Sequence, residues 1–206
     1  RSNHYGGRHW KRRPKMTSAA LLTKSLMPFR QQAWPYRVME NLVFGQHNRR
    51  FQPNRTAKDW LSSDPQQVDA YLADPHTQFH FSLSAYRDLF LLTKKKASAP
   101  RLLQKIDREL PLLLISGKED PVGHYGKSVR KLANYLNQQG QRHLTVYLLE
   151  GGRHEILNET NKQVVFHEIW QWLERIEERY QIASSFFRKL RILIIFNLFS
   201  IFLLLL

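Results

Sequence analysis

Two short apolar runs in the second half of the chain predict buried strands. Leu112–Ser116 is continuously apolar and ends at Gly117, and Leu144–Leu149 forms the second run. Helical spacing of apolar residues predicts a helix after each run, over Tyr125–Gln139 and over Asn161–Arg179. Runs that are apolar on both faces are typical of parallel strands covered by helices. Strand, helix, strand, helix in this order therefore predicts an α/β fold with a parallel sheet.

The first hundred residues show a different pattern, with helical spacing and loops but no clear strand. Between Thr17 and Phe44 the pattern predicts two short helices, separated by a break marked by Pro28 and Pro35. The stretch 44–56 is rich in Gly, Asn, Arg and Pro and indicates a loop. Three more helices are expected. The first covers Ala57–Ser62 and the third covers Ser84–Thr93. The second is capped by Ser63 or Asp64, has Pro65 in its first position and ends at about Leu72.

The two ends of the chain differ from its middle. Residues 1–16 have no helical or strand period and are expected to form a basic disordered arm. Residues 181–206 combine three basic residues with the apolar run 192–206, which as a helix would reach about 22 Å, short of the roughly 30 Å bilayer core. This tail is interpreted as a marginal membrane anchor or as an extension beyond the folded domain. The expected organisation is an arm (1–16), a helical region (17–100), an α/β segment (101–180) and this tail (181–206).

The charge distribution argues against nucleic-acid binding. The formal net charge is +15, but nine basic residues lie in the two ends, and residues 17–180 hold 23 Lys or Arg against all 17 acids. Such a middle region has no basic stripe with interleaved aromatics. The chain has no cysteine, which excludes disulfides and cysteine nucleophiles. The spacing of its histidines, together with nearby acids, does not match a metal-binding pattern, so no metal and no cofactor are expected.

Asp120 follows the first predicted strand in the segment Gly117-Lys118-Glu119-Asp120-Pro121-Val122. Ligands of parallel sheets bind at the carboxyl ends of the strands, where this acid is expected to lie. By itself the position also fits a helix cap, with Pro121 fixing the turn.

His154 follows the second strand in Glu150-Gly151-Gly152-Arg153-His154-Glu155. The two glycines predict a tight loop that presents the imidazole outside a core. Alone, His154 could be a surface histidine in a turn. An acid and a histidine after successive strands, however, match the chain order of the acid and the base in hydrolases that use a serine nucleophile.

The sequence resembles a family, the monoacylglycerol lipase and lysophospholipase group of α/β-hydrolases, related to serine aminopeptidase-like hydrolases. The matching segments are LPLLLISGKEDPVGHYGKSVRKLANYL, LTVYLLEGGRHEILNE and, upstream, FGQHNRRFQPNRTAKDWLSSDPQQVDAYLADP. The resemblance covers about residues 17–173, and RHE-x-L-N-E is its most specific part. It implies that Asp120 and His154 are the triad acid and base. It also implies that residues 17–100 form a cap or lid over an acyl-chain pocket.

One part of the family pattern is missing. The nucleophile elbow G-x-S-x-G occurs nowhere in the 206 residues, so this chain offers no nucleophile. Ser116 inside a strand and Ser128 inside a helix lack the strained turn that exposes an attacking hydroxyl. Aromatic residues such as Trp34, Trp60 and Phe79 could line a lipid pocket or simply pack the cap.

The sequence therefore predicts a partial α/β-hydrolase fold with a helical cap, belonging to a serine ester hydrolase that acts on acylglycerols or lysophospholipids. The chain is expected to be a fragment that is inactive by itself. The complete protein is expected to act on a lipid or ester substrate in the cytoplasm, where it could also associate with a membrane. The alternative is a non-enzymatic protein associated with membranes through residues 186–206.

Overall fold

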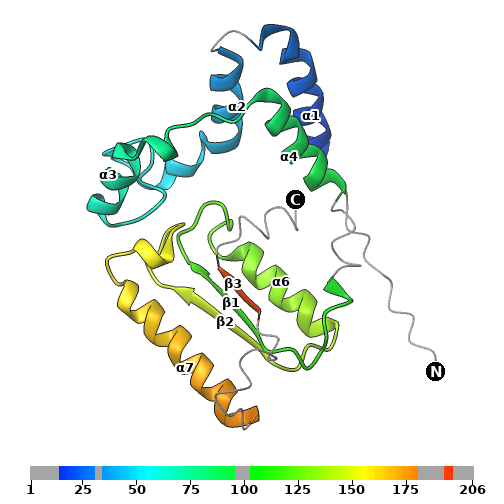
Figure 1. Ribbon diagram of the computed structural model, residues 1–206, viewed down its shortest axis with the longest axis vertical. Coiled ribbons are helices and arrows are strands. Elements are labelled where there is room, and N and C mark those ends of the chain that lie inside the picture. The colour runs from blue at the N-terminus through cyan, green and yellow to red at the C-terminus, as the bar shows by residue number, and fades with distance from the viewer. Residues whose placement is uncertain (1–13, 31–33, 96–102, 181–192, 197–206) are drawn as a thin grey trace, which may run out of the picture.

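The computed structural model of the protein describes residues 14–30, 34–95, 103–180 and 193–196. Helices α1 (Pro14–Leu26), α2 (Trp34–Phe44), α3 (Pro65–Ala73) and α4 (Leu83–Lys95) form a helical layer, with short 3-10 turns at Met27–Phe29, His47–Arg50 and Pro75–Thr77. The α/β part contains β1 (Leu112–Gly117), α6 (Lys127–Gln138), β2 (Leu144–Leu149), a 3-10 turn (Ile156–Asn158), α7 (Lys162–Tyr180) and β3 (Leu193–Phe196). Figure 1 shows the helical layer above the carboxyl ends of β1 and β2.

The sheet has the order β2-β1-β3, and both pairings are parallel. Leu112 pairs with Leu144 on one side of β1 and with Leu193 on the other. The parallel α/β arrangement expected from the sequence is therefore present, with β1 in the centre. Its six residues are all buried, as a continuously apolar run predicts.

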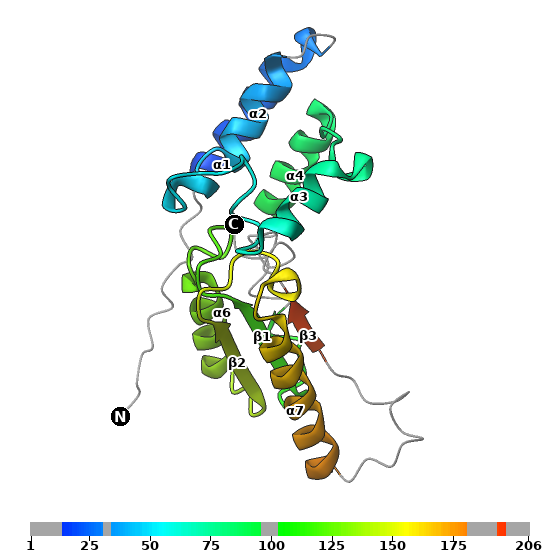
Figure 2. The same ribbon diagram turned by 90° about the vertical axis from the view of Figure 1, so that its left-hand side faces the viewer.

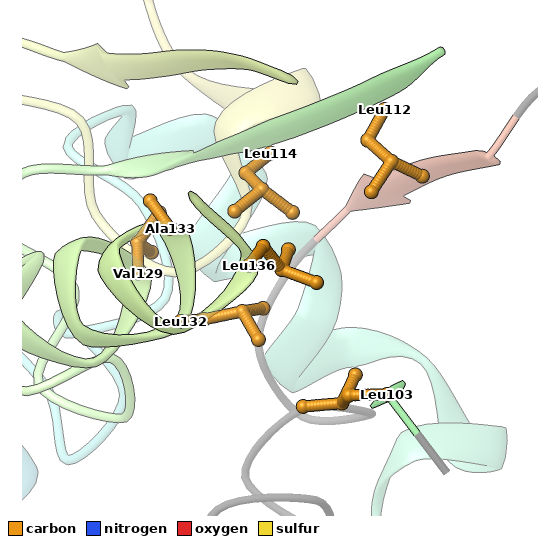
Figure 3. Packing of buried hydrophobic residues seen from close by; sticks show 7 residues of the cluster. All are labelled: Leu103, Leu112, Leu114, Val129, Leu132, Ala133 and Leu136. Carbon is orange, nitrogen blue, oxygen red and sulfur yellow. The ribbon is translucent and has the colours of Figure 1, made fainter. Parts of the chain in front are cut away.

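Helices α6 and α7 cover opposite faces of the sheet (Figure 2). Side chains of a strand alternate between its two faces. Leu112 and Leu114 accordingly pack against α6, whereas Leu113 and Ile115 pack against α7. Figure 3 shows the first of these clusters, in which Leu112 and Leu114 of β1 lie together with Val129, Leu132, Ala133 and Leu136 of α6.

The helical layer of residues 14–30 and 34–95, for which we use the name cap, has a core of its own. Residues of α1, α2 and α4 form a cluster of buried side chains, which comprises Ala19, Leu26, Met39, Leu83, Tyr86 and Phe90. A further cluster connects this layer to the α/β part, because Trp60 and Leu61 pack against Val122, two residues after Asp120. The cap is thus packed directly onto the loop that carries the predicted acid.

Several sequence expectations about the helical region are met. Pro28 lies in the break between α1 and α2, and Asp64 caps α3 by accepting a hydrogen bond from the Gln66 amide, with Pro65 in the first turn. Helix α1 begins at Pro14, three residues before Thr17, where the helical pattern was expected to begin. Residues 1–13 lie outside the described part of the chain.

The prediction of a helix over Ala57–Ser62 is wrong. The Asp59 carboxylate accepts hydrogen bonds from the amides of Arg55 and Thr56, and the side chain of Asn48 accepts one from the amide of Trp60. These side-chain acceptors replace the carbonyls that a helix would offer, and the segment forms turns instead.

Most of the expected tail 181–206 lies outside the described residues. Its described part, Leu193–Phe196, is a β-strand beside β1, whereas a membrane anchor would need a helix there. Within the described part of the chain, no helix combines the length and the apolar character needed to cross a bilayer.

Candidate active site

Asp120 lies immediately beyond β1 and is completely buried. Its Oδ1 accepts a hydrogen bond from the Val122 amide at 2.9 Å, and its backbone carbonyl accepts one from the Tyr125 amide at 2.8 Å. Its Oδ2 finds no donor among the described residues. A buried carboxylate oxygen without a donor is unfavourable, so capping the following turn does not account for this acid on its own.

The structure brings Asp120 and His154 together. His154 Nδ1 and Asp120 Oδ1 are 3.0 Å apart, although the two residues are 34 positions apart in the chain. The imidazole is 9% exposed. A histidine that uses Nδ1 to bind a carboxylate keeps Nε2 for a proton from another group, which is the arrangement of the acid and base in a catalytic triad.

Gly117 allows the two loops to meet. A Cβ atom at this position would lie 2.1 Å from the carbonyl oxygen of Arg153 and 2.3 Å from that of Gly152, so only glycine fits. The loops are joined there by hydrogen bonds from Lys118 N to Leu149 O at 2.9 Å and from Glu119 N to Gly152 O at 2.8 Å. The close approach of the strand ends therefore positions the acid beside the histidine.

The cap holds the histidine loop from above, in a region that we call the cap–loop contact (residues 59–63 against residues 153–159). The amide of His154 donates to Trp60 O at 3.3 Å, and the amide of Glu155 donates to Leu61 O at 2.8 Å. These hydrogen bonds fix the position of the backbone that carries the imidazole.

Glu159 is the buried centre of the cap–loop contact, with 1% of its surface exposed. One carboxylate oxygen accepts from the Arg153 amide at 2.6 Å, and the other accepts from the amide of Ser63 at 3.0 Å and from its hydroxyl. The guanidinium of Arg153 in turn donates to the carbonyls of Asp59 and Ser62. Hydrogen bonds to an ionised acceptor are the strong ones, so this carboxylate is well suited to join cap and loop.

A second imidazole, His47, lies near His154. Its ring meets Trp60 edge-on at 4.7 Å between centroids, and Trp60 in turn packs on His154 at 5.0 Å. Burial lowers the pKa of His47 from 6.5 to about 4, with a further contribution from the positive charge of His154. His47 is therefore neutral near pH 7.

A pocket of about 540 Å³ extends from His154 into the cap. It lies between the acid and histidine loops on one side and α2, α4 and the segment 77–81 on the other. Its walls are rich in aromatic residues, namely Phe44, Trp60, Tyr71, Phe79, Phe81 and Tyr86. Trp60, Phe79 and Phe81 thus line a pocket, whereas Trp34 is not part of its wall. A cavity of this size with apolar walls is suited to a flexible apolar group.

Neither serine considered from the sequence reaches the histidine. Ser116 is buried in β1, with its hydroxyl 3.5 Å from the Gly117 carbonyl, and Ser128 belongs to α6. Among the described residues, no hydroxyl is hydrogen-bonded to His154, and no group of three or more His, Asp or Glu side chains is arranged to hold a metal ion. Among the residues that the structure describes, the site therefore contains a carboxylate, an imidazole and a pocket, but no hydroxyl group bonded to the imidazole.

Comparisons with known proteins show the family of the chain and its fold. A family model described as serine aminopeptidase, S33, matches residues 8–161, which is more than half of the chain. The chain belongs to this serine aminopeptidase S33 family. No curated protein matches it. Its fold is a partial α/β-hydrolase fold, as the sequence predicts.

One solved structure similar to this S33 family member is the crystal structure of a highly thermostable carboxyl esterase from Bacillus coagulans in complex with glycerol. The identity is 28% and the TM-score 0.64, and the match covers 79% of this chain and 53% of the esterase. The S33 family member therefore spans about half the length of that esterase.

Sequence reasoning did not assign roles to Glu159, Arg153 or His47 in this site. Two of them lie within RHE-x-L-N-E, the segment that carries the family resemblance most specifically. A buried role for Glu159 could have been suspected there, but its partner Ser63 is 96 positions away and no periodicity reveals it.

Proposed function

We propose that this chain supplies the acid, the base and the acyl pocket of a serine ester hydrolase that acts on acylglycerols or lysophospholipids. The contact between His154 Nδ1 and Asp120 Oδ1, at the rim of an aromatic pocket, is the observation that carries this proposal. Membership of the S33 family and similarity to a carboxyl esterase support the ester class. The glycerol in the crystals of that esterase agrees with a glycerol ester as substrate.

In the proposed reaction a serine from outside this chain attacks the ester carbonyl. His154 Nε2 removes the hydroxyl proton and then returns it to the leaving alcohol, while Asp120 holds the ring and stabilises the imidazolium. The covalent acyl-enzyme is next hydrolysed by water, which His154 activates in the same way. Residues 17–100 form the cap, and the acyl chain lies among its aromatic side chains.

The test extends the chain at its N-terminus with the coding sequence that precedes Arg1 and measures hydrolysis of a short-chain ester. We expect the 206 residues alone to be inactive and the extended protein to be active. Replacing the base, His154→Ala, should lower kcat by about a million-fold, and Asp120→Asn, which acts only through that base, by about ten-thousand-fold.

The matched control is His167→Ala, because His167 lies exposed on α7 away from the pocket. It should leave the rate unchanged. An extended protein that keeps its turnover after His154→Ala would refute the assignment.

A further inference from the structure

The loop after β1, which carries Asp120, ends in three residues with left-handed backbone that we call the left-handed turn. His124, Tyr125 and Gly126 have φ angles of 49°, 58° and 75°. Glycine adopts such angles freely, whereas in His124 and Tyr125 the Cβ atom crowds the backbone. Residues with side chains persist in this conformation only where their surroundings support it. The left-handed turn therefore needs support from other parts of the molecule.

The left-handed turn is bonded to the predicted acid. The Tyr125 amide donates to the backbone carbonyl of Asp120 at 2.8 Å, and the His124 amide donates to that of Pro121 at 3.1 Å. Within the same loop, the amide of Val122 donates to the Asp120 carboxylate. The loop is thus closed on itself, so a change in the backbone of the turn is transmitted to the residue that carries the carboxylate.

Arg50 of the cap lies on the ring of Tyr125. Its guanidinium carbon Cζ is 3.6 Å from the ring centroid, well within the range of a stacked cation–π contact. Arg50 is exposed and Tyr125 is half-buried, and none of the ion pairs between described residues includes Arg50. Burial raises the pKa of Tyr125, and the charge of Arg50 opposes this shift. The guanidinium therefore acts on the ring from the side of the cap.

The segment that carries Arg50 is itself held beside the histidine. Arg50 is the last residue of the 3-10 turn that begins at His47, and the His47 ring packs on Trp60, which packs on His154. The side chain of Asn48 in the same 3-10 turn accepts a hydrogen bond from the Trp60 amide at 2.8 Å. One short segment of the cap thus contacts the acid loop at one end and, through Trp60, the histidine at the other.

We propose that Arg50 is a positioning residue for the predicted acid. Its guanidinium supports the left-handed turn through the Tyr125 ring, and the turn keeps the Asp120 carboxylate within hydrogen-bonding distance of His154. The residues that line the pocket do not include Arg50, so it acts on the pair through the backbone of the acid loop. This inference rests on the proposed function for its part in catalysis, but the contact that it concerns can be measured in the 206-residue chain by itself.

The test follows two NMR signals of the full 206-residue chain at pH 7. The first is the Nδ1 proton of His154, which a hydrogen bond to Asp120 shifts downfield and which His154→Ala assigns. The second is the hydrogen exchange of the amide of residue 125. An exposed cation–π contact shifts an equilibrium by about two- to fivefold, so Arg50→Ala should accelerate this exchange by that factor and weaken the Nδ1 signal. Tyr125→Phe keeps the ring face and should preserve both signals.

A glycine at position 125 separates support of the backbone from general packing. In Tyr125→Gly the left-handed angle is no longer strained, so adding Arg50→Ala should leave the Nδ1 signal unchanged. Arg49→Ala is the matched control, because Arg49 is an exposed arginine of the same 3-10 turn and has no cation–π contact with a described residue. It should change neither signal. The amides of β1 should stay protected in every variant, which shows that the sheet is folded.

Unchanged exchange of the amide of residue 125 in Arg50→Ala would overturn the support of the turn by Arg50. Faster exchange with an unchanged Nδ1 signal would show that the turn does not position Asp120, and this also overturns the inference. Both results leave the proposed ester hydrolase intact. Absence of the Nδ1 signal in the parent chain would instead remove the pair of side chains on which the proposed function depends.

Discussion

His47 shows how a single half-buried side chain can make stability depend on pH. Its imidazole lies between Trp60 and the charged groups of the site, and burial together with the positive charges of His154, Lys58 and His124 outweighs the attraction of Asp120. The folded protein therefore favours the neutral ring. The unfolded chain, in water, has no such preference and protonates His47 with a pKa near 6.5.

We predict that acid destabilises the protein through His47. Between pH 6.5 and about 4 the unfolded state binds more protons at this residue than the folded state, so stability rises with pH across this window and falls as pH decreases. Urea unfolding at pH 7 and pH 5 should show a lower midpoint at pH 5. His47→Gln should show a smaller loss between the same two pH values, and an identical loss in the variant and the parent would contradict the role of His47.

At the scale of elements, the loops after β1 and β2 are joined through a glycine. Gly117 ends β1 so close to the backbone of Gly152 and Arg153 that a methyl group cannot be accommodated. Gly151, one residue earlier in the same loop, has a φ of 69° but open space around its Cβ position. The two glycines are therefore required for different reasons, one for a close approach and the other for backbone conformation.

We predict that Gly117→Ala destabilises the protein more than Gly151→Ala. The first change must separate the two strand ends and should cost more than about 3 kcal/mol, whereas the second adds strain of about 1 kcal/mol. Urea unfolding measures both values. In the extended, active protein Gly117→Ala should also lower kcat, because it moves Asp120 away from His154. Equal destabilisation by the two variants would show that the close contact is unimportant.

The same elements show what the sequence could predict. Apolar runs and helical spacing identified β1, β2, α6 and α7 closely, because each of these elements buries a face whose period is visible in the sequence. The pairing of Asp120 with His154 followed from their positions after successive parallel strands. The segment 57–62 was mispredicted, because the side chains of Asp59 and Asn48 determine its conformation. His47 was missed, because only the folded cap brings it onto the Trp60 ring that also contacts His154.

At the scale of the whole molecule, the cap and the α/β part share polar and apolar contacts. Trp60 and Leu61 pack on Val122, and Glu159 accepts hydrogen bonds from the amides of both layers. The contact between Ser63 and Glu159 joins residues 96 positions apart. Because the contacts lie at the site, the stability of the site depends on both layers.

We predict that Glu159→Ala destabilises both the cap and the loop that carries His154. Removing the carboxylate leaves the buried amides of Ser63 and Arg153 without an acceptor and should cost about 3 kcal/mol. Hydrogen exchange should show faster exchange in both α3 and the loop 150–155. Glu150→Ala is the control, because the Glu150 side chain is 78% exposed and its ion pair with Lys118 contributes little. Loss of protection in the loop alone would show that Glu159 does not join the layers.

The cap–loop contact also restricts how a ligand can reach the histidine. Since the amides of His154 and Glu155 are bonded to Trp60 and Leu61, a hinged swing of the whole cap would pull the imidazole off Asp120. On the side of the pocket lined by residues 77–81, two aromatic side chains lie at the surface, because Phe79 is 64% exposed and Phe81 38%. We therefore expect a ligand to enter on this side, while the hydrogen bonds between the cap and the histidine loop stay intact.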